Sequence, residues 1–459
     1  MATHRSHPSE SHLPSTSRRE FLKLSSLALA SMAGGHGAAA GAAQSATLRG
    51  AVLGRDNPLA GRIVLYHDSQ MYVESVFDAG RIEEVVAHGV RLLTGIGDTA
   101  AAFESLFPDP ILTTTTKIAI KVNCIGPTDT RWETVRGIVA GLRLMLGGTY
   151  DITNVTIYDN RYIGGHGYTA ANFDFDGVQP TIASGLTVEH GYYPVAGHKL
   201  CDYLIDGDYL INVPALKSHS ATHEITIALK NHYGSCSPAN ICATGNVPKM
   251  LDLNTDANIK GKTALVVTDG LRGTYNGGPS EWPQIWEMYP DQTPNTLFFA
   301  NDPVTNEYWG LDMINAERAL HGWSAKTCSW IETASGDPHY LGISDPGAMT
   351  VIHYDPAGLP GEAWEASRGI FLVPNVPNPF RDGTLVRFRL PETMRAHLSI
   401  RDISGRLVRD LGEREYAAGY SAVSWDGRNA RGRAMPAGVY FATLAAGSLQ
   451  RTRRILRVR

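Results

Sequence analysis

The sequence predicts an α/β protein, with one layered domain built on a mostly parallel sheet and a small all-β sandwich behind it. Two patterns carry this prediction. From about residue 62 to 320, short apolar runs alternate with stretches whose apolar residues recur at helical spacing, as in strand–helix–strand units. From about residue 371 onward, short alternating segments follow one another, and turn residues separate them. A chain of 459 residues is also too long for one ordinary domain.

The first pattern divides into strands and helices in order. Strands are expected at 62–68, 117–123, 154–159, 208–214, 262–269 and 296–300. Helices are expected at 81–96, 132–146, 223–233 and 304–320. Asp302 followed by Pro303 is a typical start for the last of these helices, with Asp302 as its cap. Because strands alternate with helices, we expect a largely parallel sheet.

The second pattern consists of short strands only. They are expected at 385–390, 396–400, 407–411, 422–425, 439–445 and 452–458. Glycine-containing turns separate them, at 404–405, 418–419, 426–427, 436–438 and 446–447. Short strands at this spacing indicate a small all-β sandwich.

Charge is distributed unevenly along the chain. The formal net charge of −4 gives by itself no sign of nucleic-acid or membrane-surface binding, and we expect no nucleic-acid partner. However, residues 381–459 contain sixteen arginines, no lysine and seven acidic residues, a net +9, whereas residues 44–380 carry a net −15. The basic tail could therefore dock on its own acidic domain or on an anionic envelope surface.

The first 43 residues have the order of a signal peptide. A twin-arginine pattern, Ser17-Arg18-Arg19-Glu20-Phe21-Leu22-Lys23, precedes an uncharged stretch at 24–32 and a small-residue run at 38–43. Paired arginines indicate the Tat export machinery as a partner. We therefore expect an exported protein, located in the periplasm, at the cell surface or secreted. No later run approaches the roughly 20 apolar residues of a membrane span, so no such span is expected in the mature chain.

The cysteines are odd in number, so at least one is unpaired or a ligand. They are Cys124, Cys201, Cys236, Cys242 and Cys328. Cys236 and Cys242 are close enough for a short-loop disulfide in an oxidising compartment, whereas Cys124 and Cys201 are expected to be buried thiols. A C-x2-C-x2-C run is absent, which argues against an intrinsic ferredoxin-type iron–sulfur cluster.

Polar residues at the ends of the expected strands are the candidate site. In open α/β sheets, ligands bind outside the carboxyl ends of strands. The lysines could clamp an anionic ligand, His219 could be an acid, a base or a ligand, and Asp269 could hold a metal or orient a lysine. The candidate catalytic residues are Lys121, Lys217, His219, Lys230 and Asp269, and the candidate cofactor-binding residues are Asn123, Asp159 and Asn231.

A metal site is a second interpretation of the same region. His219 and His223 have i, i+4 spacing, so on one helix both imidazoles would face the same way and could bind a metal ion. A helix that starts near Thr222 would instead leave His219 in the preceding loop. The glycine-rich run 163–167 lies in a long loop at 161–194, and it lacks the G-x-G-x-x-G order of a dinucleotide site.

Several short motifs within residues 60–320 resemble the domain-of-unknown-function family 362. They are IAIKVN, INVPALKSH, ITIALKNHYG, VVTDGL with Gly277-Gly278-Pro279, and FANDPV. The resemblance implies an α/β domain, placed here at 44–370, of a kind sometimes found in iron–sulfur proteins. After FANDPV the family continues to an Asp, whereas this chain has Glu307. The family-like positions are Lys121, Asn123, Asp159, Lys217, His219, Lys230, Asn231, Asp269, Asn301 and Asp302.

The tail, at 371–459, resembles the FlgD-type Ig-like modules and the type IX secretion sorting domains. The matching words are Asn378-Pro379-Phe380, Ile403-Ser404-Gly405-Arg406, Trp425-Asp426-Gly427-Arg428 and Pro436-Ala437-Gly438-Val439-Tyr440. This resemblance implies sorting or attachment at the cell surface, with outer-envelope secretion or attachment machinery as a partner. The alternative is a β-domain that only stabilises the protein.

Two functions are consistent with these observations. One is an exported enzyme or cofactor protein that binds a metal ion or an anionic small ligand at the strand ends. The other is a non-catalytic periplasmic or cell-surface binding protein. The enzyme hypothesis requires Lys121, His219, Lys230 and Asp269 to converge on one pocket.

Overall fold

The computed structural model describes most of the chain after the predicted signal peptide. The segment 1–43 lies outside the described residues, as do His223 and Cys242. No described helix is long and apolar enough to cross a membrane. The described residues are 57–107, 112–220, 224–238, 247–278, 280–289, 291–356, 370–376, 379–390, 393–416, 419–447 and 449–458.

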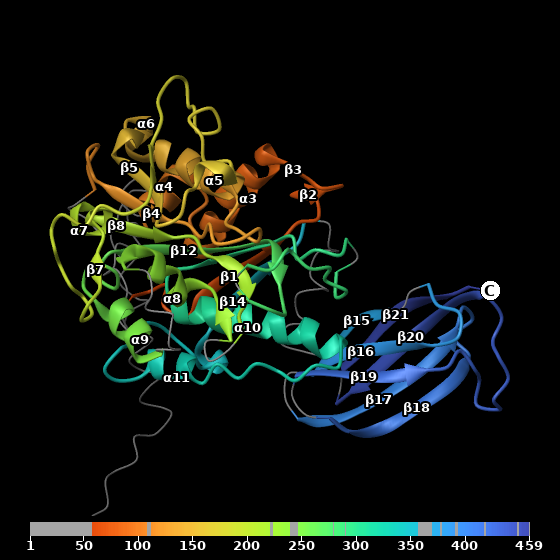
Figure 1. The fold of residues 1–459 in the computed structure, drawn as a ribbon. Helices are drawn as coiled ribbons and strands as arrows, with labels where there is room; N and C mark the ends of the chain where they lie inside the picture. The colour runs from red at the N-terminus through yellow and green to blue at the C-terminus, as the bar shows by residue number, and fades with distance from the viewer. Residues whose placement is uncertain are drawn as a thin grey trace, which may run out of the picture. The chain divides into compact units, whose positions relative to one another are not determined.

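One ten-stranded sheet forms the centre of the α/β unit (Figure 1). Its strands are β1 (Arg62–His67), β4 (Ile118–Lys121), β5 (Val155–Asp159), β6 (Thr181–Ser184), β8 (Tyr209–Asn212), β9 (Ala215–Ser218), β10 (Ile225–Thr226), β12 (Thr263–Thr274), β13 (Thr296–Ala300) and β14 (Thr350–Tyr354). The order is β14-β1-β13-β12-β8-β4-β5-β6, with β9 beside β12 and β10 beside β9.

The sheet is mostly parallel, as the sequence predicted. The pairs β1–β14, β4–β5, β4–β8, β5–β6, β8–β12 and β9–β12 are parallel. In contrast, β13 is antiparallel to both β1 and β12. A parallel return requires a crossover, usually a helix, and the described residues between β12 and β13 form no helix. The chain therefore turns back antiparallel at this point.

Helices cover both faces of this sheet (Figure 1). One face carries α3 (Ala79–Thr94), α4 (Thr99–Glu104), α5 (Trp132–Arg143) and α6 (Met145–Gly148), which share a core with alternate strand residues such as Val64 and Ile120. The opposite face packs Ile63 and Ala119 against other helices, because strand side chains alternate between faces. These are α7 (Asp202–Asp206), α8 (Ala228–Asn231), α9 (Val247–Thr255), α10 (Pro303–Leu320) and α11 (Trp330–Ser335).

Short elements complete the α/β unit. Two small ribbons pair β2 (Tyr72–Val73) with β3 (Val76–Phe77) and β7 (Lys199–Leu200) with β11 (Cys236–Ser237). The described 3-10 turns are η1 (Ile152–Asn154), η2 (Gly164–His166), η4 (His232–Ser235) and η6 (Pro346–Ala348).

Two predicted boundaries are wrong, and one cap is confirmed. The helix expected at 223–233 is interrupted, because Ile225 and Thr226 pair with β9 as β10, which leaves only the short α8 before η4. The strand expected to end at Asp269 continues to Thr274. Asp302 caps α10 as predicted, since its Oδ1 accepts a hydrogen bond from the Thr305 amide at 2.7 Å.

The C-terminal β-module is the predicted all-β sandwich. One sheet has the order β15-β16-β19 and the other β18-β17-β20-β21, and all their pairs are antiparallel. Phe380 and Tyr440 each lie 5.3 Å, between ring centroids, from the fully buried Trp425. The strands are β15 (Phe371–Val376), β16 (Thr384–Leu390), β17 (Met394–Asp402), β18 (Leu407–Tyr416), β19 (Gly419–Trp425), β20 (Gly438–Ala446) and β21 (Leu449–Arg457).

Candidate functional site

Lys121 and Asp159 form a buried ion pair at the carboxyl ends of two neighbouring strands. Lys121 ends β4 and Asp159 ends β5, which is parallel to β4. The Lys121 Nζ lies 3.1 Å from Asp159 Oδ1, and both side chains are almost fully buried. Asp159 Oδ2 accepts a hydrogen bond from the Cys124 amide at 2.7 Å. This carboxylate therefore neutralises the lysine and also fixes the loop that follows β4.

Asn231 connects this ion pair to the other strand ends. Its Oδ1 accepts hydrogen bonds from Lys121 Nζ at 3.3 Å and from Asn123 Nδ2 at 3.1 Å. Its Nδ2 donates to Asn212 Oδ1 at 2.8 Å, and Asn212 in turn donates to the Ala228 carbonyl at 2.9 Å. The sequence-based candidates did not include Asn212. The signal was present, because it ends a strand as Lys121 and Asp159 do.

Lys217 joins the same set of hydrogen bonds without a carboxylate contact. Its fully buried Nζ donates to Asn123 Oδ1 at 2.6 Å and to the Ile125 carbonyl at 2.8 Å. Burial lowers the pKa of Lys217 to about 7, although the charges of Asp129 and Asp159 oppose this shift. We call Lys121, Asn123, Asp159, Asn212, Lys217 and Asn231 the lysine–amide network. It unites five of the eight residues that the sequence offered as candidate catalytic or cofactor-binding residues.

Gly234 allows the backbone of η4 to lie against this network. A Cβ atom at this position would lie 2.5 Å from Asp159 Oδ1 and 2.8 Å from Lys121 Nζ. Both distances are too short for a carbon atom, so the ion pair requires glycine here. The final Gly of the family-like word ITIALKNHYG therefore has a packing role, which sequence patterning did not assign.

Asp269 does not hydrogen bond to the network. Its Oδ2 accepts from the Arg131 amide at 2.9 Å and from Thr134 Oγ1 at 2.8 Å, and its Oδ1 accepts from the Leu271 amide at 3.1 Å. Burial raises the pKa of Asp269 to about 6. Because Arg131 is the N-cap residue of α5, this carboxylate holds the start of that helix. The expected position at a strand end is wrong, since β12 runs five residues further.

His219 and Lys230 lie beside the network in a second, positively charged group. His219 follows β9 and is partly exposed, and Lys230 lies in α8, where its Nζ donates to Thr226 Oγ1 at 3.3 Å. Lys326 Nζ donates to the His219 carbonyl at 3.0 Å. Burial and the charges of Lys230, Lys326 and Lys217 all lower the pKa of His219. We call His219, Lys217, Lys230 and Lys326 the His219 cluster.

Glu307, the departure from the family pattern, has a local structural role. It is fully buried in α10, and its Oε1 accepts a hydrogen bond from the Leu229 amide in α8 at 2.6 Å. Burial raises the pKa of Glu307 to about 8, while the nearby Lys230 opposes that shift. Burial therefore weakens the negative charge that Glu307 contributes beside Lys230.

The predicted metal and cysteine sites receive only partial tests. Among the described residues, no group of three or more His, Cys, Asp and Glu side chains is placed to hold a metal ion. His223 lies outside the described residues, so its pairing with His219 stays a prediction. Cys124, Cys201 and Cys236 are buried free thiols. This confirms the prediction for the first two and leaves Cys236 without the disulfide considered from sequence.

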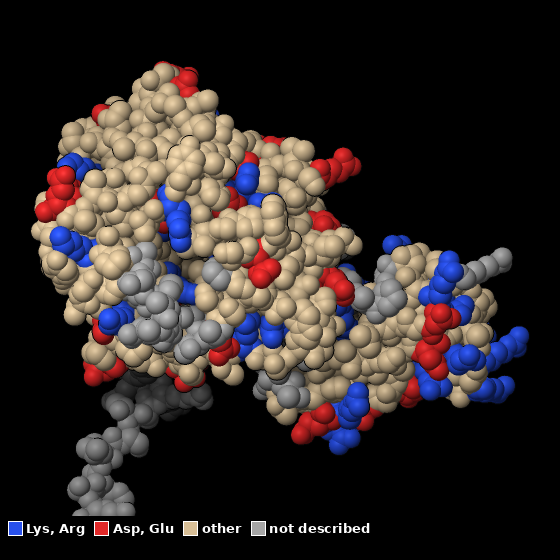
Figure 2. Space-filling view, in the orientation of Figure 1, with Lys and Arg blue, Asp and Glu red and all other residues tan. Residues whose placement is uncertain are grey.

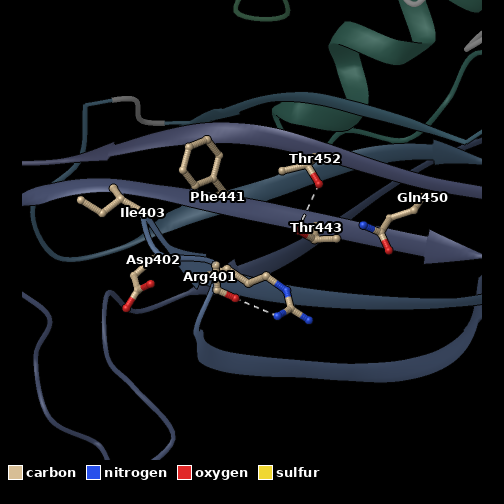
Figure 3. Close-up of a pocket in the computed structure, with 8 residues that line it drawn as sticks. Arg401, Asp402, Ile403, Phe441, Thr443, Gln450 and Thr452 are labelled. Atoms are coloured by element: carbon tan, nitrogen blue, oxygen red, sulfur yellow. Dashed lines mark hydrogen bonds between the residues drawn. The ribbon is translucent and has the colours of Figure 1, made fainter.

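Two surface depressions lie away from these residues. One of about 470 Å³ lies along α3 and α5, with Arg136 and Phe175 at its edge. The other, of about 230 Å³, lies on the β-module, where Phe441, Thr443 and Thr452 line it (Figure 3). Neither contains a member of the lysine–amide network or the His219 cluster.

The surface charge follows the sequence only in part. On the face of the β-module shown in Figure 2, several Lys and Arg side chains are visible, with acidic side chains between them. On the same face of the α/β unit, charges of both signs are scattered among uncharged residues. The lysines of the network are not part of this surface, because Lys121 and Lys217 are buried.

Two segments of the chain match the models of known families. Residues 118–312 match the model of a domain of unknown function, DUF362, and residues 377–449 match the FlgD Ig-like domain. Both resemblances expected from the sequence are therefore confirmed. No curated protein matches the chain.

Three solved structures are similar to parts of the chain. PorZ, described as an essential bacterial surface component of the type-IX secretion system of Porphyromonas gingivalis, is 25% identical over 22% of this chain and 13% of its own, with a TM-score of 0.16. Dimeric latent PorU from the same organism is 20% identical over 19% and 9%, with a TM-score of 0.17. FlgD from P. aeruginosa is 26% identical over 16% and 60%, with a TM-score of 0.14.

Proposed function

We propose that this chain, in which a FlgD Ig-like domain follows a DUF362 domain, is an exported protein that binds a small anion at the strand ends of its α/β unit. The observation that carries this proposal is the His219 cluster. Lysines from three places in the chain, Lys217 in β9, Lys230 in α8 and Lys326 before α11, act together on one partly exposed imidazole. Such a concentration of positive charge favours a carboxylate or phosphate ligand.

Two acidic side chains lie near the cluster, Glu224 beside Lys326 and Glu307 beside Lys230. Glu224 accepts hydrogen bonds from the Thr327 amide at 2.7 Å and from Thr327 Oγ1 at 3.0 Å, so it is held by a loop. Burial raises the pKa of Glu307 to about 8, which weakens the negative charge that it contributes. The three lysines of the cluster outnumber these two side chains, which favours a negatively charged ligand.

The lysine–amide network adjoins the His219 cluster and holds one of its lysines in place. Lys217 belongs to both groups, and its contacts with Asn123 and Ile125 fix it at one end of the cluster. A rigid support keeps a binding site in its productive geometry. Lys121 is engaged by Asp159, and Asp269 holds the start of α5. These contacts support positioning roles for both residues, and binding is accordingly the activity that we assign to the cluster.

Export and attachment form the second part of the proposal. The twin-arginine pattern at Arg18 and Arg19 would direct the folded protein through the Tat route, and the FlgD Ig-like module would then sort or attach it at the cell envelope. Replacing both arginines by lysine should retain the full chain in the cytoplasm. Normal export of this double variant, measured by cell fractionation, would contradict the Tat assignment.

Calorimetry tests the binding site. Inorganic phosphate and citrate are titrated into the full chain and into Lys230→Gln, and Lys117→Gln is the control, since Lys117 is an exposed lysine just before β4, at the opposite end of that strand from Lys121. We expect at least one anion to bind, with about tenfold lower affinity in Lys230→Gln, equivalent to about 1.4 kcal/mol. Binding should also weaken with added salt. Equal affinities in the two variants, or no binding by the wild type, would overturn the proposal.

A further inference from the structure

His166 and Asp129 form a second pair of titratable groups that the proposed anion site does not use. The His166 Nδ1 lies 2.7 Å from Asp129 Oδ2. The Asp129 side chain is only 4% exposed, whereas that of His166 is 24% exposed. Since Nδ1 is hydrogen-bonded to Asp129, Nε2 is the ring nitrogen left to exchange a proton, and it makes no hydrogen bond to the described residues. A buried carboxylate that fixes one ring nitrogen orients the imidazole and stabilises its protonated form.

Two arginines lie against the other oxygen of this carboxylate. Asp129 Oδ1 is 3.5 Å from Nη2 of Arg272, in β12, and 3.7 Å from Nη1 of Arg131. Arg131 is also paired with Glu133, at 3.2 Å, so its charge is largely compensated. Arg272 additionally donates to the Pro127 carbonyl at 3.3 Å, but its buried Nε has no hydrogen-bond partner among the described residues. Arg272 is therefore the cation with spare donor capacity.

A glycine-rich loop holds His166 against Asp129. Gly167 has φ +86°, and a Cβ there would lie 2.2 Å from Trp132 Cδ1, so only glycine fits. The loop is tied down on both sides, since the Ile163 amide donates to Ser184 Oγ at 3.1 Å and the Tyr168 hydroxyl donates to the Thr130 carbonyl at 3.0 Å. The run 163–167 does not match a nucleotide-binding motif. Its role here is to position His166 against Asp129.

We propose that Asp129 and His166 are a proton-transfer pair, with Arg272 binding the carboxylate or phosphate group of an anionic substrate beside them. In the forward step, His166 Nε2 accepts a proton from an O–H or C–H group of the substrate, and the bonding electron pair stays on the substrate atom. Asp129 stabilises the imidazolium that forms. The proton then returns from Nε2 to the substrate or passes to water, which restores the neutral ring.

The molecule contains a matched control for this pair. His190 Nε2 lies 2.9 Å from Asp206 Oδ1, but these side chains are 46% and 52% exposed. Water screens such a contact. The same pairing of residue types therefore occurs in a buried, arginine-flanked setting at His166 and on the open surface at His190, as it also does at His397 with Asp410.

The ring resonances of the histidines test the pairing. The full chain is labelled at its histidine ring nitrogens, and His166→Asn assigns the signals. At constant pH the Nδ1 resonance of His166 should move strongly in Asp129→Asn, because this ring nitrogen loses its charged hydrogen-bond partner. Asp206→Asn should move the His190 Nε2 resonance much less, since water screens that exposed contact. An unchanged His166 resonance in Asp129→Asn would overturn the pairing.

Anion titration tests the role of Arg272. Phosphate and malonate are added as probes at constant pH, and the His166 signal should shift in the wild type more than the His190 signal does. In Arg272→Gln the response should disappear, because the positive charge that binds the anion is lost. This variant also keeps the test valid if Asp129→Asn does not fold. Equal anion responses in wild type and Arg272→Gln, or equal shifts of His166 and His190, would overturn the substrate assignment.

Discussion

Lys121 and Lys217 are buried to the same degree but have different partners. Lys121 has a carboxylate at 3.1 Å, whereas Lys217 donates to an amide oxygen and a backbone carbonyl. Lys121 ends β4 and Lys217 lies next to the end of β9, two strands of one sheet, and both side chains contact asparagines of the lysine–amide network. The difference between them is thus one of charge compensation and not of depth.

This difference suggests different roles for the two ends of the network. The Lys121 end is closed, because the Asp159 carboxylate and the Gly234 backbone leave no space beside the ion pair. The Lys217 end continues into the His219 cluster, where Lys230 and Lys326 also act on His219. We therefore assign a structural role to the first end and ligand binding to the second. The predictions below separate them.

The largest effect is expected at the closed end. Asp159→Asn removes the carboxylate and leaves Lys121 buried without its counter-ion, which should reduce the free energy of unfolding by about 3–5 kcal/mol. Urea denaturation measures this loss. The control is Asp176→Asn, which removes an exposed partner of Arg143 and should cost less than about 1 kcal/mol. Similar losses in the two variants would mean that the buried pair has no special role.

A smaller loss is expected from crowding the same ion pair. Gly234→Ala places a Cβ atom 2.5 Å from Asp159 Oδ1, and overpacking of this kind costs about 1–3 kcal/mol. Gly97→Ala is the matched control, since nothing lies within 4 Å of a Cβ at that position. The thermal midpoints of the two variants are compared with that of the wild type. A Gly234→Ala protein as stable as the control would contradict the close packing described here.

The third effect is a pH dependence at the open end. Lys217 has a pKa of about 7 in the folded protein and about 10.4 in the unfolded chain. Between these values the unfolded state holds one more proton, so the free energy of unfolding should rise with pH from about 7 upward, by at most about 1.4 kcal/mol per pH unit. Below about pH 7 both states are protonated, and this contribution is constant.

Lys217→Met isolates that contribution. The difference in unfolding free energy between wild type and variant should grow in favour of the wild type from pH 7 to 9. Lys117→Met, at an exposed lysine, should instead run parallel to the wild type. If the curves for wild type and Lys217→Met are parallel, Lys217 remains protonated in the folded protein, and the contrast with Lys121 fails.

Much of the network was predictable because parallel strands place their carboxyl ends at one edge of a sheet. Lys121 and Asp159 lie at or near the ends of predicted strands, and Lys217 follows the strand predicted at 208–214, so recognising these strands was enough to bring the three residues together. The sequence analysis did not predict that Lys217 lies in a further strand, β9. The same reasoning misplaced Asp269, because β12 continues past this residue, which therefore lies in the middle of the strand. A run of apolar residues predicts where such a strand begins. It does not predict where the strand ends if polar residues continue to pair with the neighbouring strand.

Other features depend on contacts that no local pattern records. His166 and Asp129 are 37 residues apart, in two loops without a recognised motif. Lys326 Nζ donates a hydrogen bond to the His219 carbonyl, although the two residues are 107 positions apart in the sequence. The antiparallel direction of β13 follows from the absence of a crossover helix among the described residues before it, whereas the rhythm of strands and helices predicted a parallel neighbour. Loop geometry, more than strand propensity, limits the prediction of the site.

The most direct test of the anion site is a crystal structure of the full chain grown with phosphate at a concentration that saturates binding in calorimetry. We predict phosphate within hydrogen-bond distance of Lys230 Nζ and Lys326 Nζ, next to His219, and its loss from this position in Lys230→Gln. Phosphate bound elsewhere in the wild type, with the His219 cluster holding only water, would contradict the account.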